Sequence, residues 1–143
     1  MKIAVVRVRG CRKISPRIVK TLELLRLEQP NHCVLVEDSP QNKGMLEHAK
    51  DYVTFGPVSE ETIFSLLQRR GRKGSGLLRS IVNEEELRKM AKEIFDGRKT
   101  LDFASPVFRL SPPSKGYKDK KRDYPQGDLG RRDEMDSLLR RMM

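Results

Sequence analysis

Carboxylates are the residue type of this chain that could supply acid–base chemistry. Glu37, Asp38 and Asp51 are near enough to form a pair for general acid–base catalysis. No nucleophile or base signature accompanies them, and Asp38 precedes Ser39-Pro40, where an aspartate commonly stabilises a turn. An enzyme, such as a metal-dependent nuclease or an RNA-modifying enzyme that uses these carboxylates, is therefore the least favoured interpretation.

Two glycine-containing segments superficially resemble phosphate-binding loops. They read GCRKIS at residues 10–15 and GRKGSG at residues 71–76, and neither has the G-x-x-x-x-G-K-[ST] spacing that wraps backbone amides around a phosphate. The soft metal ligands fit no zinc pattern either. These ligands are Cys11, Cys33, His32 and His48. The sequence therefore predicts no cofactor, no metal and no small-molecule substrate.

Positive charge dominates the composition, and it is concentrated in three segments. The 143 residues include 30 Lys and Arg against 20 Asp and Glu, a formal net charge of +10. Residues 7–20 hold six basic residues and no acid, residues 69–79 hold five and no acid, and residues 115–122 hold five with one acid. The rest of the chain is net acidic. Clustering in loops that contain Gly and Pro favours a polyanionic partner over an evenly solvated surface.

The kind of polyanion follows from the residues around the charge. Composition alone does not separate nucleic acid from an anionic membrane surface, and no apolar run approaches the roughly 20 residues of a membrane span. No secretory signal is visible, so the expected compartment is the cytosol. Tyr117 and Tyr124 lie among the cations of the third cluster, where a ring can stack on an unpaired base while the cations hold the backbone. The alternative for this cluster is a disordered tail. The alternative for the whole protein is a nonspecific DNA-binding chromatin protein.

The first 57 residues alternate between strand and helix patterns. Apolar, β-branched runs predict strands at 3–8, 32–37 and 52–55. An amphipathic helix is expected from Pro16 to about Leu27 with Ser15 as its cap, and a shorter one over 44–50. The connection over 39–50 is short for a parallel crossover. We therefore expect a three-stranded, at least partly antiparallel sheet with both helices on one face, and a second face covered by the rest of the chain or by a partner.

The fold class predicted for the whole chain is α+β: a β-α-β-α-β core at residues 1–58 and a helical and irregular C-terminal extension at 59–143. Ser59 and Asn83 are expected to cap two helices of the extension, with a flexible hinge at 71–76 between them. The arm of the extension is too poor in aliphatic residues to bury a core of its own. The expected elements are helices near 60–70 and 84–95, a short strand at 107–110, a basic irregular arm at 111–130 and a terminal helix at 133–142.

Several short motifs resemble, in their order along the chain, one ribosomal protein family. They are Arg9-Gly10, Asn31-His32-Cys33-Val34, Asn42-Lys43-Gly44-Met45-Leu46, Asp51-Tyr52-Val53-Thr54-Phe55-Gly56, Phe108-Arg109-Leu110-Ser111-Pro112-Pro113 and Gly127-Asp128-x-Gly130-Arg131. The family is the large-subunit ribosomal protein numbered thirty in bacteria and archaea and seven in eukaryotes. The bacterial form stops after the third strand, so the continuation to residue 143 resembles the archaeal form.

The resemblance implies a small α/β core with a three-stranded antiparallel sheet and a role without catalysis. It implies binding to folded ribosomal RNA near the 5S RNA, a single copy in the large subunit of the cytoplasmic ribosome, neighbouring ribosomal proteins as partners and no membrane. By position, the loop 9–13, the start of the first helix and the loop 42–44 match the family's RNA-facing parts; the other candidates rest on charge. The predicted RNA-binding residues are Arg7, Arg9, Arg12, Lys13, Arg17, Lys20, Asn42, Lys43, Arg72, Lys73, Arg109, Lys115, Tyr117, Lys118, Lys120, Lys121, Arg122, Arg131 and Arg132.

Overall fold

The computed structural model describes residues 2–10, 15–73, 76–97, 107–114, 116–117, 127, 129–132 and 135–143. Within these residues five strands form one mixed sheet, in the order β6-β2-β1-β3-β7. The strands are β1 (Lys2–Arg7), β2 (His32–Glu37), β3 (Val53–Pro57), β6 (Val107–Arg109) and β7 (Gly130–Arg131).

The three strands of the predicted core are antiparallel, as expected. In their register Val5 faces Val34 on β2 and Phe55 on β3. The sheet is wider than predicted, because β6 adds to β2 in antiparallel fashion and β7 adds to β3 in parallel. The α+β class is confirmed, while the sheet draws two of its strands from the C-terminal extension.

One face of the sheet packs against the two helices between the core strands, which confirms that both helices lie on one face. These helices are α1 (Pro16–Leu24) and α2 (Pro40–Ala49). Side chains alternate between faces along a strand, so β1 turns Ile3 and Val5 toward these helices. The remaining buried members of this cluster are Leu22, Leu25, Leu27, Val34, Leu46, Ala49, Val53 and Phe55.

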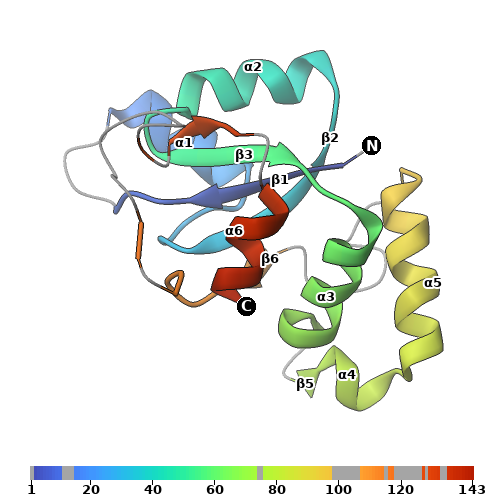
Figure 1. Cartoon of the computed structure of the whole chain (residues 1–143). Helices are drawn as coiled ribbons and strands as arrows, with labels where there is room; N and C mark the ends of the chain where they lie inside the picture. Colours follow the sequence, from blue (N-terminus) through green and yellow to red (C-terminus); the bar gives the residue numbers. More distant parts are fainter. Residues whose placement is uncertain are drawn as a thin grey trace.

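The other face is covered by the chain itself rather than left for a partner. Ala4 and Val6 of β1 belong to a second cluster formed largely by the extension. Figure 1 shows α3 (Glu60–Arg70) and α6 (Met135–Met142) on the side of the sheet opposite α2, with α5 (Glu84–Phe95) packed outside α3. The buried apolar residues that these helices contribute include Ile63, Leu66, Leu67, Leu87, Ile94, Leu138 and Leu139.

Side-chain caps fix where three of the helices begin. The hydroxyl of Ser39 accepts from the Asn42 amide, that of Ser59 from the Thr62 amide, and the Asn83 side chain from the Glu86 amide. The Ser39 cap, with Pro40 as the first helical residue, starts α2 at Pro40 rather than near Gly44 as the sequence suggested. The caps of the two extension helices lie at the predicted residues.

The segment predicted as a flexible hinge contains a small hairpin. Strands β4 (Arg72–Lys73) and β5 (Gly76–Leu77) pair antiparallel, with residues 74–75 outside the described part. A short helix α4 (Leu78–Ile81), which the sequence did not suggest, follows directly. The Leu78 amide donates to the carbonyl of Gly71 at 2.9 Å and closes the base of the hairpin. The hairpin therefore has a defined place at the end of α3.

The predicted arm ends in a strand rather than in irregular chain. Gly130 and Arg131 form β7, opposite Thr54 and Phe55. The hydroxyl of Thr54 donates to the Gly130 carbonyl at 3.1 Å. The chain approaches β3 so closely that a Cβ on Gly56 would collide with the backbone carbonyl of Arg132. Residues 115, 118–126 and 128 of the arm lie outside the described residues.

Candidate nucleic-acid interface

Antiparallel pairing brings basic residues from separate parts of the sequence to one end of the sheet. Arg7, the last residue of β1, pairs with Val53, the first of β3. His32, the first residue of β2, pairs with Arg109, the last of β6. Figure 1 shows α1 lying beside this end of β1 and β3. We call this surface the basic end, and define it by Arg9, Arg17, Lys20, His32 and Arg109.

Arg7 lies at the basic end, but its side chain is directed into the protein. The residue is only 4% exposed. Its Nη1 donates to the Leu27 carbonyl at 2.8 Å and its Nε to the Arg9 carbonyl at 3.0 Å. Its own carbonyl accepts from the Asn31 amide at 2.7 Å. Arg7 therefore joins the loop after β1 to the connection between α1 and β2, a role that the sequence did not reveal.

The outward cations of the basic end come from the loop after β1 and from α1. The guanidinium of Arg9 lies 5.3 Å from the ring centre of Tyr52, and the Tyr52 carbonyl accepts from the amides of Val8 and Arg9. Arg17 and Lys20 are exposed near the start of α1. The Ser15 side chain makes no capping hydrogen bond there, so backbone amides of the first turn add to the positive potential.

The pKa of His32 reflects its burial and the positive charges near it. Its pKa is lowered from the ordinary 6.5, first by burial and then by the charges of Arg109 and Arg7, while Glu28 opposes the shift. His32 is therefore neutral at pH 7. Because the unfolded chain binds this proton more tightly, the stability contribution of His32 is present above pH 6.5 and is lost as the pH falls through the folded value.

Replacing Arg109 by Gln is expected to raise the pKa of His32 without restoring it to 6.5, because burial is the larger cause of the shift. An NMR titration of the His32 ring measures this directly. The matched change Lys43→Gln, at the opposite end of β2, should leave the His32 titration where it was. An unchanged His32 pKa in the Arg109 variant would contradict the electrostatic interaction between the two residues.

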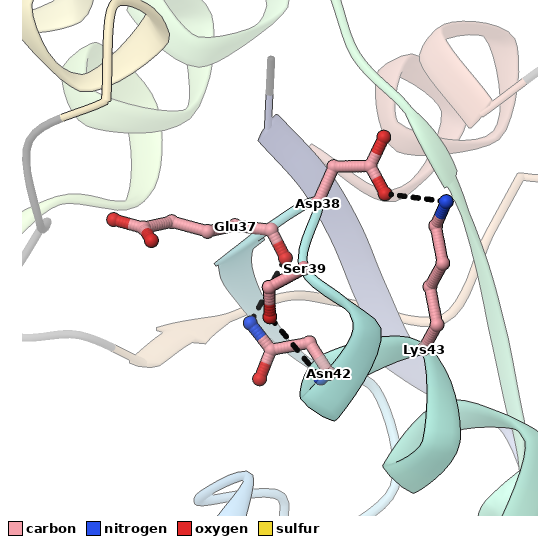
Figure 2. Close-up of polar contacts among 5 residues, drawn as sticks. All are labelled: Glu37, Asp38, Ser39, Asn42 and Lys43. Carbon is pink, nitrogen blue, oxygen red and sulfur yellow. Dashed lines mark hydrogen bonds and ion pairs between the residues drawn. The ribbon is translucent and has the colours of Figure 1, made fainter.

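The opposite end of the sheet is acidic, and it holds two of the predicted RNA-binding residues. Figure 2 shows Lys43 pointing at Asp38, with Nζ and Oδ1 3.1 Å apart, and the side-chain Nδ2 of Asn42 donating to the Glu37 carbonyl at 2.9 Å. Glu60 and Glu61 begin α3 at the same end. The structure therefore separates Asn42 and Lys43 from the basic end by the length of β2, and gives both residues local partners at the start of α2.

Other predicted residues are divided between the surface and the interior. Arg131 is exposed on the edge strand β7, whereas Arg132 is 7% exposed. The hydroxyl of Tyr117 donates to Asn31 Oδ1 at 2.6 Å, and its half-buried ring packs against the larger core cluster. Tyr117 is thus engaged within the protein rather than presented for base stacking.

The cations of the middle cluster lie on and around the β4–β5 hairpin. Arg72 and Lys73, which were predicted to bind RNA, are both exposed and so accessible to it. Arg69 and Arg79, which the prediction left out of the site although they belong to the same charge cluster, are exposed beside them. The predicted residues that lie outside the described part of the chain are Arg12, Lys13, Lys115, Lys118, Lys120, Lys121 and Arg122.

Metal and thiol chemistry find no support in the part of the chain that the structure describes. No group of three or more His, Cys, Asp or Glu side chains is gathered there in a way that could hold a metal ion. Cys33 is buried, and burial raises the pKa of its thiol to about 12, which keeps it protonated and unreactive. Among the described helices, none has the length and apolar character needed to cross a membrane.

Known proteins resemble this chain over almost its whole length. A family model described as ribosomal protein L30p/L7e matches residues 3–53, from β1 to the first residue of β3. The large ribosomal subunit protein uL30 of Archaeoglobus fulgidus is 41% identical, over 97% of this chain and 98% of that protein. Proteins of the same name from Methanocella arvoryzae and Methanosphaera stadtmanae are 40% and 35% identical, over 87% and 98% of this chain and 87% and 99% of their own lengths.

Proposed function

Because the chain belongs to the ribosomal protein L30p/L7e family, we propose that it holds folded ribosomal RNA of the large subunit at the basic end of its sheet. As a member of this family it is a structural constituent of the large ribosomal subunit, in the cytoplasm, and not an enzyme. It associates there with ribosomal RNA and other ribosomal proteins. The surface that meets the RNA, a place near the 5S RNA and a single copy per particle are parts of the proposal.

The observation that carries the proposal is the separation of charge along the sheet. Arg109 ends β6 opposite the start of β2, Arg9 follows β1 at the same end of the sheet, and Arg17 lies in the first turn of α1, which lies beside that end in Figure 1. Glu37 and Asp38 lie at the other end of β2. In the described part of the chain no ion pair holds the three arginines. A phosphate backbone is attracted to one end of the molecule and repelled from the other, so this polarity fixes an orientation on RNA.

The basic end is suited to RNA shape rather than to sequence. Arg and Lys neutralise phosphates without reading bases. Arg9 sits over the Tyr52 ring and so keeps a defined direction. Arg7 and Arg132 are left out of the proposed contact set because both are buried.

Reversing Arg17 and Lys20 together to Glu is expected to weaken binding to large-subunit ribosomal RNA about tenfold to a hundredfold. Each phosphate that the protein no longer neutralises also lowers the slope of log K against log salt concentration by roughly 0.7–0.9, so the double variant should be less salt-sensitive. Filter binding across a salt series measures both effects. Both residues are exposed, so the melting temperature should change little.

Lys89→Glu with Lys92→Glu on α5 is the matched control, since it makes the same charge change on another exposed surface. This control should keep the wild-type salt slope. Equal losses of affinity in both variants would mean that only net charge matters, which would remove the basic end from the proposal. Competition with duplex DNA of equal charge tests the alternative of a chromatin protein. The proposed function predicts that folded ribosomal RNA is bound in preference to the DNA, whereas a chromatin protein would show no such preference.

A further inference from the structure

A second basic surface lies on the β4–β5 hairpin, which we call the hairpin surface and define by Arg69, Arg72, Lys73 and Arg79. All four side chains are exposed. The segment 69–79 contains no acidic residue, and no ion pair within the described residues holds any of the four. Their charge is therefore available to an anionic partner.

The hairpin surface is held in place by the fold. Its base is closed by the hydrogen bond from the Leu78 amide to Gly71. Just before it, Arg70 anchors the end of α3: Nη2 donates to Ser111 Oγ at 2.8 Å and to the Met143 carbonyl at 3.1 Å, and Nη1 to the Arg109 carbonyl at 3.4 Å. These contacts fix the point at which the hairpin leaves the body. A partner thus meets a positioned group of cations.

The hairpin surface lies across the sheet from the α1 part of the basic end, although Arg70 at its base donates to the carbonyl of Arg109. Figure 1 shows β5 and α4 at the extremity of the molecule beyond α3, whereas α1 and α2 lie across the sheet from it. Arg17 and Arg72 therefore contact different parts of a bound RNA. The two surfaces also belong to different layers of the fold, since α1 covers one face of the sheet and α3 the other.

We propose, resting on the proposed function, that the hairpin surface binds the phosphate backbone of a second RNA segment, so that the protein holds two segments in a fixed relation. Protein interfaces are usually centred on buried, well-packed side chains, with aromatic residues and arginine prominent. Among the described residues next to the hairpin surface, one exposed large apolar side chain is present, Ile81, which lies close to Gly76. Cations without an aromatic anchor suit phosphates better than an acidic protein.

Holding two RNA segments would let the extension strengthen RNA binding beyond what one contact provides. Once one surface is bound, the second binds at a high effective local concentration, so each contact strengthens the other without new interactions. The rigid body between the surfaces, built from α3, α6 and the sheet, then sets the geometry of the two RNA segments. The extension would act as a brace within folded RNA.

Hydroxyl-radical footprinting on protein-free large-subunit ribosomal RNA tests this directly. Wild type should protect two separate RNA stretches. Arg72→Glu with Lys73→Glu should lose one stretch and keep the one that Arg17→Glu with Lys20→Glu loses, with about tenfold weaker protection at the lost stretch. Arg72→Gln with Lys73→Gln should show the same pattern more weakly, and the α5 control Lys89→Glu with Lys92→Glu should keep both stretches.

A hairpin variant that keeps both stretches, or that protects neither stretch even at a protein concentration high enough to saturate the basic end alone, would overturn the inference while leaving the proposed function in place. The inference would also be overturned if the hairpin variant kept both RNA footprints but lost, in the assembled subunit, a cross-link from the hairpin to an acidic protein. If the wild-type protein protects no RNA at all, it is the proposed function that fails. Melting curves of each variant, matched to wild type, show that the changes act at the surface and not on folding.

Discussion

Replacing Phe108 with alanine is expected to lower the free energy of unfolding by about 3–5 kcal/mol, which is a large part of the roughly 5–15 kcal/mol that a domain has. Phe108 is fully buried on β6 and faces Cys33 of β2. Its ring belongs to the cluster that covers the extension side of the sheet. Truncation leaves a cavity between the edge strand and α3, and the edge of β2 loses part of its cover.

Urea unfolding followed by circular dichroism measures this loss of stability in the absence of RNA. Phe108→Leu serves as the graded control, since it keeps most of the apolar volume and should cost less than about 1.5 kcal/mol. Ser114→Ala, at an exposed position beyond the strand, should change little. A loss below about 1 kcal/mol for Phe108→Ala would mean that β6 does not dock on β2 in the free protein.

The elements that the sequence predicted well are those with a local signal. The strand at His32–Glu37 and the helix at Glu60–Arg70 have apolar periodicity, and the helix also has a capping serine and a dipole-matched charge order. The antiparallel core followed from the length of the connection over residues 39–50, because so short a segment hardly reaches across a parallel pair. Each of these inferences needed only neighbouring residues.

The elements that were missed depend on contacts between distant residues. β7 has two residues and exists because Thr54 and Phe55 offer an open edge more than seventy positions earlier in the chain. The hairpin at 72–77 reads locally as a glycine-rich hinge, and its order comes from α3 and α4. Short pairings of this kind carry no periodicity from which they could be recognised.

Charge clusters predicted where cations gather along the chain, but not which cations face outward. Lys43 lies in one of the motifs that resemble the family, yet it belongs to the first turn of α2, which begins at the acidic end beside Asp38. Tyr117 looked suited to base stacking, and its hydroxyl is bonded to Asn31 instead. The sequence does not distinguish the roles of Arg9 and Arg7, because both are arginines of one cluster. In the structure Arg9 is partly exposed and Arg7 is buried. Burial, which decides the role, depends on the folded neighbours.

Arg7→Met is expected to lower the free energy of unfolding by about 2–4 kcal/mol, although it removes a charge from the end of an already basic strand. The buried guanidinium spans the carbonyls of Leu27 and Arg9, and both acceptors lose their charged donor. The connection that it holds includes Arg26 and Asn31, two non-glycine residues with positive φ, a backbone conformation that costs free energy and persists only where surrounding contacts hold it. Arg7→Lys keeps the charge but replaces the rigid fork by a single ammonium, and we expect nearly the same loss of stability.

RNA binding distinguishes a positioning role for Arg7 from direct phosphate contact. If Arg7 acts through the loops, both Arg7 variants, measured at low temperature where they remain folded, should bind large-subunit ribosomal RNA more weakly while the slope of log K against log salt stays at its wild-type value. Arg17→Gln, which removes an exposed cation and disturbs no loop, should instead reduce that slope by roughly 0.7–0.9. A reduced slope in Arg7→Met together with full rescue by Arg7→Lys would assign Arg7 to the phosphate backbone. Different slopes for two arginines of one basic cluster would show that folding, and not charge alone, determines which cations meet the RNA.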